Sequence, residues 1–148
     1  MRCGITAAAA TLALSVAVQA AAGDEAHLLG KYVKKIGGDT IQVSLHPVIA
    51  KDRRNQVQVF FTYDGPGGEN IDFDGIGRMQ GNKVTLYYHT YRLNVTLNNG
   101  GTADLALEQS CGNHRLYPGY GYYAQHCDPE VANLAPHAKG LRKESPGR

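Results

Sequence analysis

The chain has 148 residues, of which 43% are hydrophobic and 19% charged, and its formal net charge is +2. This near-neutral balance argues against nucleic-acid binding, which depends on a clear excess of Lys and Arg. The excess of positive charge lies in the last residues, 137–148, because the rest of the chain is slightly acidic, so the basic character belongs to one end rather than to the body.

The first residues have the pattern of a secretory signal peptide. Arg2 gives a positive start, an uncharged apolar run follows at residues 7–18, and small residues suited to signal peptidase lie at 18–22. The run is too short for a membrane span, and Cys3 precedes it, whereas a lipidated cysteine would have to follow it. We therefore expect residues 1–22 to be removed and a soluble protein to reach the periplasm or the medium.

The remaining body alternates short β-rich runs with turn residues. These runs are residues 28–36, 40–45, 57–63, 71–74, 83–88, 91–97, 102–108 and 120–127. Most place apolar residues on one face and polar residues on the other, which is typical of half-buried strands. Turns of two to five residues join antiparallel neighbours, so the pattern predicts an antiparallel meander of about eight strands, closed into a small barrel, over residues 23–134.

The longest turn signal is the glycine-rich segment Asp64–Asn70, followed by two carboxylates at Asp72 and Asp74. Carboxylates two residues apart on a strand share a face, so these two could hold calcium together with Asp64 or Glu69. A solvated outer face next to a turn explains the same residues, and we favour it because the spacing matches no EF-hand loop.

Cys111 and Cys127 are the cysteines that remain after the signal segment, and two cysteines in an exported chain predict one disulfide. The alternative is half of a zinc site completed by His114 and His126. A disulfide closing a loop of this length stabilises the fold by about 3 kcal/mol.

The loop between the cysteines contains a tyrosine-rich segment, residues 116–123. Tyrosine offers a large contact area at low entropic cost, which suits a recognition surface. The other interpretation is a last barrel strand whose alternate tyrosines, Tyr120 and Tyr122, pack in the core. Tyr117 and Tyr123 are then the better surface candidates.

Residues 135–148 are rich in Pro, Gly and basic residues and lack apolar periodicity. Such segments seldom bury enough apolar surface to order themselves. We therefore expect a disordered basic tail.

Several short motifs resemble those of known barrels. Gly30–Tyr32 resembles the G-x-W opening of lipocalin-like barrels, with Tyr in place of Trp. The segments Phe73–Gly77, Gly81–Leu86, Leu93–Leu97 and Cys111–Gly112 resemble those of small exported β-barrel proteins of Gram-negative bacteria. Some of those proteins are similar to periplasmic lysozyme inhibitors. The resemblance implies a barrel and an exported location, and it suggests inhibition of a hydrolase.

We therefore expect a monomeric, non-catalytic binding protein without cofactor or resident metal, such as a lysozyme or hydrolase inhibitor or an immunity-type protein. Exposed loops on a rigid scaffold would make the contacts. The candidate contact residues are Asp64, Gly67, Glu69, His114, Arg115, Tyr117, Tyr120 and Tyr123. A lipocalin-like carrier of a small apolar ligand is the alternative. A metal-dependent hydrolase would need clustered His and acidic side chains.

Overall fold

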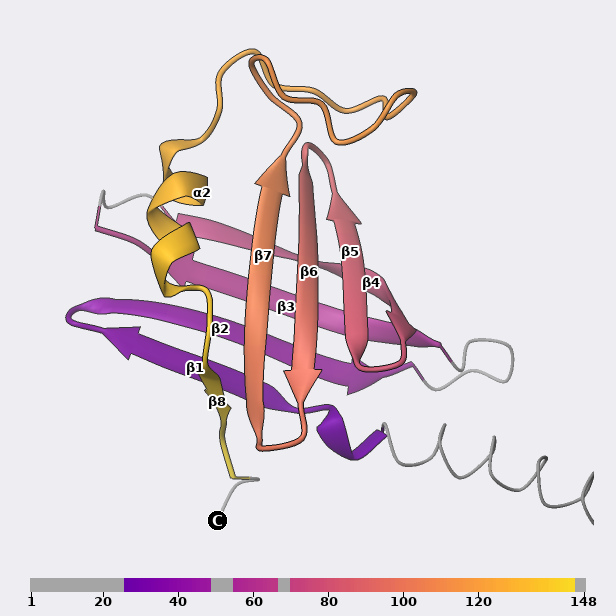
Figure 1. Ribbon diagram of the computed structural model, residues 1–148, viewed down its shortest axis with the longest axis vertical. Helices are drawn as coiled ribbons and strands as arrows, with labels where there is room; N and C mark the ends of the chain where they lie inside the picture. The colour runs from indigo at the N-terminus through magenta and orange to yellow at the C-terminus, as the bar shows by residue number, and fades with distance from the viewer. Residues whose placement is uncertain (1–25, 49–54, 67–69, 146–148) are drawn as a thin grey trace, which may run out of the picture.

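The computed structural model describes residues 26–48, 55–66 and 70–145. Eight strands pair in chain order into a closed antiparallel barrel, which confirms the expected fold class (Figure 1). The strands are β1 (Lys31–Ile36), β2 (Asp39–Pro47), β3 (Gln56–Asp64), β4 (Asn70–Gln80), β5 (Lys83–Tyr88), β6 (Tyr91–Asn98), β7 (Thr102–Gln109) and β8 (Leu141–Lys143). A 3-10 helix, η1 (Ala26–Leu28), precedes β1, and α2 (Pro129–Leu134) and η2 (Ala135–His137) precede β8.

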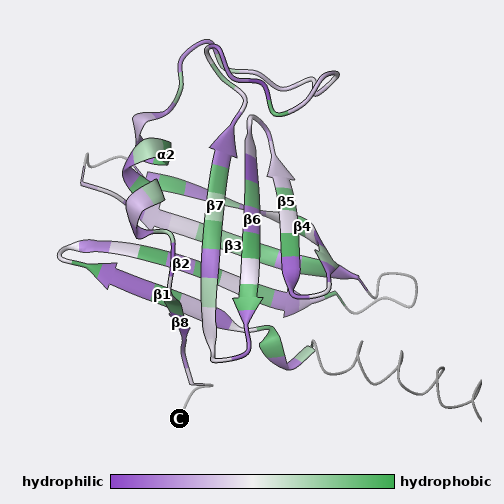
Figure 2. Ribbon diagram, viewed as in Figure 1, coloured by the Kyte–Doolittle hydropathy of each residue, from purple (hydrophilic) through white to green (hydrophobic). Residues whose placement is uncertain are grey.

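Alternation along the strands separates the barrel interior from its outer surface. In β3 the side chains of Val57, Val59, Phe61 and Tyr63 are buried and the intervening ones are not. The same period gives the strands of Figure 2 their changing hydropathy. The inward side chains join one core cluster, to which Leu134 and Leu141 from the C-terminal region also belong. Each fully buried aliphatic or aromatic side chain stabilises the fold by about 1.5–3 kcal/mol.

The barrel wall has a corner at β4, near Gly75 and Gly77. β4 pairs with β3 at residues 70–78, but with β5 only at residues 78–80. A Cβ on Gly77 would lie 2.9 Å from a methyl carbon of Val84, and one on Gly75 would lie 2.9 Å from a methyl carbon of Leu86. The glycines therefore let β5 side chains approach the β4 backbone, while β5 runs alongside β6 and β7, across the direction of β1–β3 (Figure 1).

The C-terminal segment corrects the expectation of a disordered tail. Residues 135–145 are ordered, and β8 inserts between β7 and β1 to close the barrel. Leu141 is 0% exposed and lies opposite Ala103 of β7. The prediction failed because a three-residue strand is too short to show periodicity and because its pairing partners lie far away in the sequence. Residues 146–148 lie outside the described ranges.

The predicted last strand, residues 120–127, is also wrong. This stretch has no strand, and Ala124 makes a single bridge to Cys111. Tyr120 and Tyr122 do not enter the barrel core, because the loop runs over the outside of the barrel end (Figure 1). The segment that follows forms one short helix, α2, which begins with Pro129 at a position where its missing N–H costs nothing.

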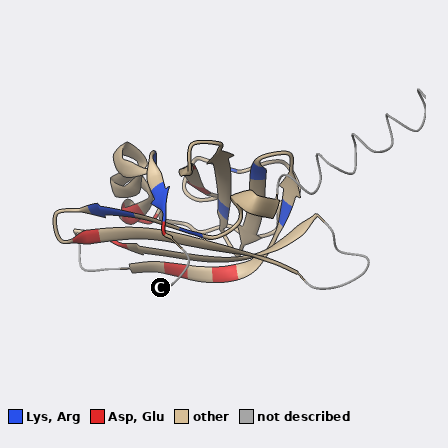
Figure 3. Ribbon diagram, turned by 90° about the horizontal axis from the view of Figure 1, so that it is seen from below, with Lys and Arg blue, Asp and Glu red and all other residues tan. Residues whose placement is uncertain are grey.

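Two further sequence predictions concern composition and export. Acidic and basic positions are spread over several elements, in keeping with the small net charge (Figure 3). In the described part of the chain, no helix has the length and apolarity needed to cross a bilayer. The expected signal segment, residues 1–22, lies outside the described residues.

Candidate functional site

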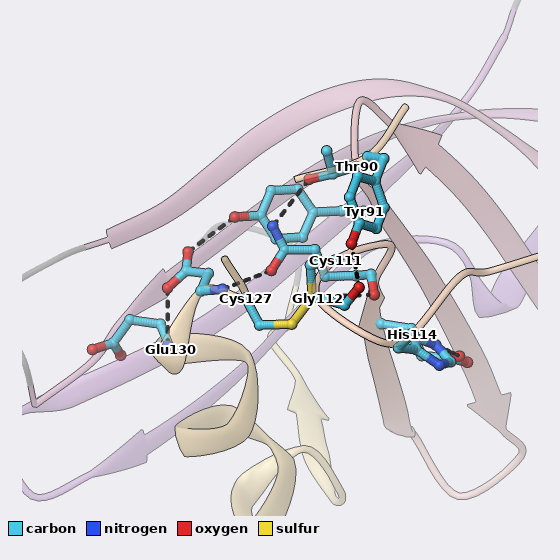
Figure 4. The surroundings of a disulfide bond; sticks show 11 residues. Thr90, Tyr91, Cys111, Gly112, His114, Cys127 and Glu130 are labelled. Carbon is cyan, nitrogen blue, oxygen red and sulfur yellow. Dashed lines mark hydrogen bonds and ion pairs between the residues drawn. A yellow bond between two sulfur atoms is a disulfide. The ribbon is translucent and has the colours of Figure 1, made fainter. Parts of the chain in front are cut away.

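The loop that follows β7 is tied to the barrel at its two ends. The expected disulfide between Cys111 and Cys127 is present, at a sequence separation of 16 (Figure 4). Inside it, the backbone N–H groups of Cys111 and His114 donate to each other's carbonyls, both at 2.8 Å. Ala124 N–H donates to the carbonyl of Ser110 at 2.9 Å. The loop is therefore anchored along its base rather than at a single bond.

A partly buried polar network joins the same base to the β5–β6 turn and to α2. The Gln109 side chain donates to Thr90 Oγ1 at 3.1 Å and accepts from the Asp128 N–H at 2.7 Å. Asp128 caps α2 by accepting from the Glu130 N–H at 2.9 Å, and it accepts from the Tyr91 hydroxyl at 2.9 Å. Figure 4 shows these bonds as a chain beside the disulfide. We call this set, Thr90, Tyr91, Gln109 and Asp128, the polar clamp.

The clamp changes the acidity of one of its members. Burial, followed by the hydrogen bond to Asp128 and the charge of Asp128, raises the pKa of Tyr91 to about 12. The phenol thus stays protonated and continues to donate over the whole physiological pH range. A permanent donor at this position keeps the start of α2 fixed to β6.

The tip of the loop turns through Tyr117–Tyr120. Pro118 and Gly119, whose φ is +89°, are the residues that a type II turn requires at its two central positions. The turn is closed by a 3.3 Å hydrogen bond from the Tyr120 N–H to the Tyr117 carbonyl. Its effect is to present the tyrosine side chains on both sides of the turn to the β5–β6 hairpin.

Five aromatic side chains meet there, and we call them the aromatic rim. They are Tyr87, His89, Tyr117, Tyr120 and Tyr122. Ring centroids lie 5.1 Å apart for Tyr117 and Tyr120, 6.0 Å for Tyr87 and Tyr117, and 5.6 Å for His89 and Tyr122. Tyr87, Tyr117 and Tyr122 remain 44%, 43% and 56% exposed. The rim therefore combines internal packing with a large exposed aromatic surface.

The centre of the rim is held by Tyr120. Its hydroxyl donates to the His89 carbonyl, and His89 has a φ of +50°, which orients this turn residue in the left-handed region. Burial raises the pKa of Tyr120, and its neighbours Tyr117, Tyr122 and Tyr87 add to the effect. Tyr120 therefore acts as a neutral donor that attaches the loop to the hairpin.

Arg115 and Tyr123, two other predicted contact residues, pair with each other on the same loop. The guanidinium carbon of Arg115 lies 4.2 Å from the ring centroid of Tyr123, a cation–π contact. The Tyr123 hydroxyl donates to the Gly112 carbonyl. Tyr123 thus supports the loop from within, while Arg115 stays exposed.

Below the rim, a row of outward side chains crosses three strands. Glu108, Arg92 and Tyr87 are register neighbours on β7, β6 and β5. Arg92 donates to Glu108 at 2.9 Å, and this hydrogen bond is the main reason why the pKa of Arg92 is raised. Predicted residue His114 approaches Glu108 at 3.6 Å. The row connects the disulfide loop to the β4–β5 corner.

A surface groove of about 580 Å³ lies at that corner, on the outer side of β4 and β5. It is lined by Gln56, Ile76, Gly77, Arg78, Gln80, Lys83, Thr85 and Tyr87. Tyr87 belongs to both the groove and the aromatic rim. The two features therefore form one continuous candidate surface.

The other predicted contact segment lies elsewhere at this end of the barrel. Asp64 is exposed at the end of β3, while Gly67 and Glu69 lie outside the described residues. A Cβ on Gly65 would come 1.9 Å from Glu130 Oε2, so this segment rests on α2 rather than on the aromatic rim. Figure 4 shows the Glu130 side chain pointing away from the disulfide.

The described residues do not assemble the ligands of either metal site considered from the sequence. Cys111 and Cys127 bond to each other, and Asp72 and Asp74 are exposed on the outer face of β4. Within residues 26–48, 55–66 and 70–145, no three His, Cys, Asp or Glu side chains gather as a metal site would require. The chemistry that the site offers is contact through aromatic faces, amides and cations.

Two of the five rim residues were predicted from the sequence as contact residues. Tyr117 and Tyr120 were predicted as contact residues, whereas Tyr87, His89 and the groove were not. The available signal was the outward alternation of Lys83, Thr85 and Tyr87 in β5, which was interpreted only as the polar face of a strand.

Comparison with known proteins adds no relative: no protein-family model, no curated protein and no solved structure matches the chain.

Proposed function

We propose that this chain is an exported, non-catalytic binding protein that blocks a cell-wall hydrolase, such as a lysozyme, by covering it with the aromatic rim. The observation that carries the proposal is the rim itself, in which three tyrosines are about half exposed. Two of them, Tyr117 and Tyr122, lie on a loop held by a disulfide and the polar clamp, and the third, Tyr87, lies on β5. Monomeric proteins seldom expose large apolar groups together unless the patch has a partner.

The physical advantage of this surface is preorganisation. Tyr120 is bonded to the β5–β6 turn, and the base of the loop is fixed by Cys111 and Ala124. Little conformational entropy is then lost when a partner binds, so more of the contact energy appears as affinity. Tyrosine is also among the residues enriched at the energetic centres of protein interfaces.

The compartment and the partner class are part of the proposal. A disulfide is typical of proteins that work in oxidising surroundings, and the start of the chain has the pattern of a secretory signal. The motifs similar to those of exported Gram-negative barrels, some of them similar to lysozyme inhibitors, suggest a hydrolase of the cell wall as the target.

The alternative, a lipocalin-like carrier, would need an apolar cavity inside the barrel. The inward side chains of the described strands pack together in one core cluster that includes Phe61, Phe73 and Tyr32. Phe73 alone stacks on Tyr88 at 5.0 Å and on Tyr91 at 5.6 Å. The interior is used for packing, so we prefer the surface-binding function.

The test is capture and inhibition with the oxidised protein lacking residues 1–22. Immobilised protein is exposed to a panel of lysozymes and other cell-wall hydrolases, and lysis of cell-wall suspensions by each captured enzyme is then measured. Stoichiometric capture with loss of lysis is the expected result. The variant Tyr117→Ser/Tyr122→Ser should lose about tenfold or more in affinity, as expected for interface hot spots.

A matched control is Phe60→Ser, because Phe60 is 44% exposed on β3, outside the rim. It should bind like the unaltered protein. Equal losses in both variants would contradict the assignment of the contact to the rim. Capture of no hydrolase by the folded, oxidised protein would reject the proposed function.

A further inference from the structure

The groove at the β4–β5 corner is built from three successive rows of outward side chains. The first row contains Ile76 and Tyr87, and it lies where β4 and β5 no longer pair. In the second row Gln56 and Thr85 both lie opposite Arg78, and in the third Gln80 lies opposite Lys83. The groove therefore changes from apolar beside the aromatic rim to basic and amide-rich at the far turn.

The charge of the groove has one sign. Among the residues that the structure describes, its lining includes Arg78 and Lys83 and no Asp or Glu. Both cations are exposed, and neither forms an ion pair with any residue in the described ranges. Gln56 Oε1 also lacks a hydrogen-bond partner among those residues. An occupant that brings carboxylates and N–H donors would complement these groups.

The spacing of the rows matches an extended chain. Residues i and i+2 of a strand are about 6.7 Å apart, so the three rows span about 13 Å. Alternate side chains of an extended peptide repeat at the same interval. A peptide lying along the groove can therefore place one side chain on each row.

We propose that the groove binds an extended acidic segment of the partner protein with the pattern apolar–x–acidic–x–acidic. The apolar residue lies against Ile76 and Tyr87, the first carboxylate faces Arg78, and the second faces Lys83. The proposal rests on the proposed function in taking the partner to be a protein, and Tyr87 links the groove contact to the rim contact.

The experiment uses a synthetic peptide and does not require the partner. Fluorescein-labelled Leu-Thr-Glu-Thr-Glu is titrated with the oxidised protein, with Leu-Thr-Gln-Thr-Gln and the scrambled Glu-Glu-Leu-Thr-Thr as controls. We expect saturable binding of the first peptide only, weakened when salt is raised from 50 to 500 mM because exposed charge pairs are screened. Arg78→Gln and Lys83→Gln should each weaken binding by about two- to fivefold.

Charge reversal separates a specific contact from general attraction. Arg78→Glu/Lys83→Glu should lose the acidic peptide and bind Leu-Thr-Lys-Thr-Lys instead. Lys35→Glu, at an exposed position on β1, is the control and should leave binding unchanged. Circular dichroism of each variant checks that the barrel is intact.

The outcomes distinguish the two proposals. Peptide binding that depends on Arg78 and Lys83 supports the groove assignment even if no hydrolase is captured. Capture through the rim with no peptide binding, or binding equally weakened by Lys35→Glu, overturns the groove assignment alone. Binding of an anionic oligosaccharide such as trigalacturonate, but not of the peptide, also overturns it, because the occupant would then be a glycan.

Discussion

Strand pairing is shortest in two parts of the barrel wall, of which one is covered by other segments of the chain and the other is open. Between β7 and β1, the three-residue β8 makes two register pairs on each side, and α2 packs beside β7. Between β4 and β5, three register pairs remain and the groove lies open beside them. One gap is covered by the chain's own residues, whereas the other is lined with exposed cations, amides and Tyr87.

This difference indicates where a partner can reach the barrel wall. An uncovered strand edge exposes unpaired backbone groups and is usually protected. The β7–β1 side is protected in this way by the eleven residues that follow α2, residues 135–145, which include β8. The open β4–β5 corner carries no such cover, and the aromatic rim lies next to it. A partner that binds the rim therefore has direct access to the corner.

The largest expected effect is on the covered side. Leu141→Ala should lower the free energy of unfolding by about 2–5 kcal/mol, because it opens a cavity at a fully buried position opposite Ala103. Urea denaturation of the oxidised protein measures it. The neighbouring Arg142→Ala, at an exposed position in the same strand, should change stability by less than about 0.5 kcal/mol. Equal, small effects in the two variants would show that β8 does not close the barrel.

A smaller effect is expected at the open corner. Gly77→Ala should cost about 1–3 kcal/mol, since its Cβ would lie 2.9 Å from Val84 Cγ1, 3.1 Å from the Thr85 carbonyl and 3.2 Å from Val59 Cγ2. Gly75→Ala should cost less, because its one close neighbour is a methyl carbon at the end of Leu86. Val84→Ala combined with Gly77→Ala should recover part of the loss in a double-mutant cycle. A greater cost at Gly75 than at Gly77 would contradict this account of the corner.

The contrast also explains which parts of the fold were predictable. β2, β3 and β6 have long alternating patterns bounded by turn residues, and local sequence is enough to recognise them. β8 has no such pattern. It is extended because it pairs with the edges of β1 and β7, which lie far away in the sequence. The tyrosine segment gave the opposite error, a strand predicted where none exists. Its alternate tyrosines pack on the β5–β6 turn and do not belong to a strand.

The candidate site divides in the same way. The disulfide and the exposure of Tyr117 follow from composition and local turn chemistry. The contribution of Tyr87 and His89 depends on how the meander brings the β5–β6 hairpin under a loop that begins after β7. The groove depends on the divergence of β4 from β5. Gly75 and Gly77 permit this divergence, but their presence in the sequence is not enough to predict it. These long-range relations are not visible in any short stretch of sequence.

The smallest effect concerns the polar clamp that fixes α2 on the covered side. The pKa of Tyr91 is raised from 10.0 to about 12, so the fold favours the protonated phenol. Its contribution to stability is fully present below pH 10 and is lost as the pH rises through about 12. The thermal unfolding temperature of the unaltered protein should therefore fall more steeply over this pH interval than that of Tyr91→Phe, because the phenylalanine side chain has no proton to lose.

Asp128→Asn isolates the electrostatic part of this effect. Asn still caps α2 and still accepts from the Tyr91 hydroxyl, but it carries no charge. Because the charge of Asp128 is only the last of three causes, after burial and the hydrogen bond, the Tyr91 titration should move only part of the way back toward 10.0. The comparison is made by ultraviolet absorbance of the phenolates, as a difference from Tyr91→Phe, since burial raises the pKa of Tyr32, Tyr63 and Tyr120 as well. If Tyr91 titrates near 10.0 in the unaltered protein, the hydroxyl is not held by Asp128, and the anchoring of α2 must then come from the hydrogen bond between the Asp128 N–H and Gln109, the neighbouring disulfide and apolar contacts.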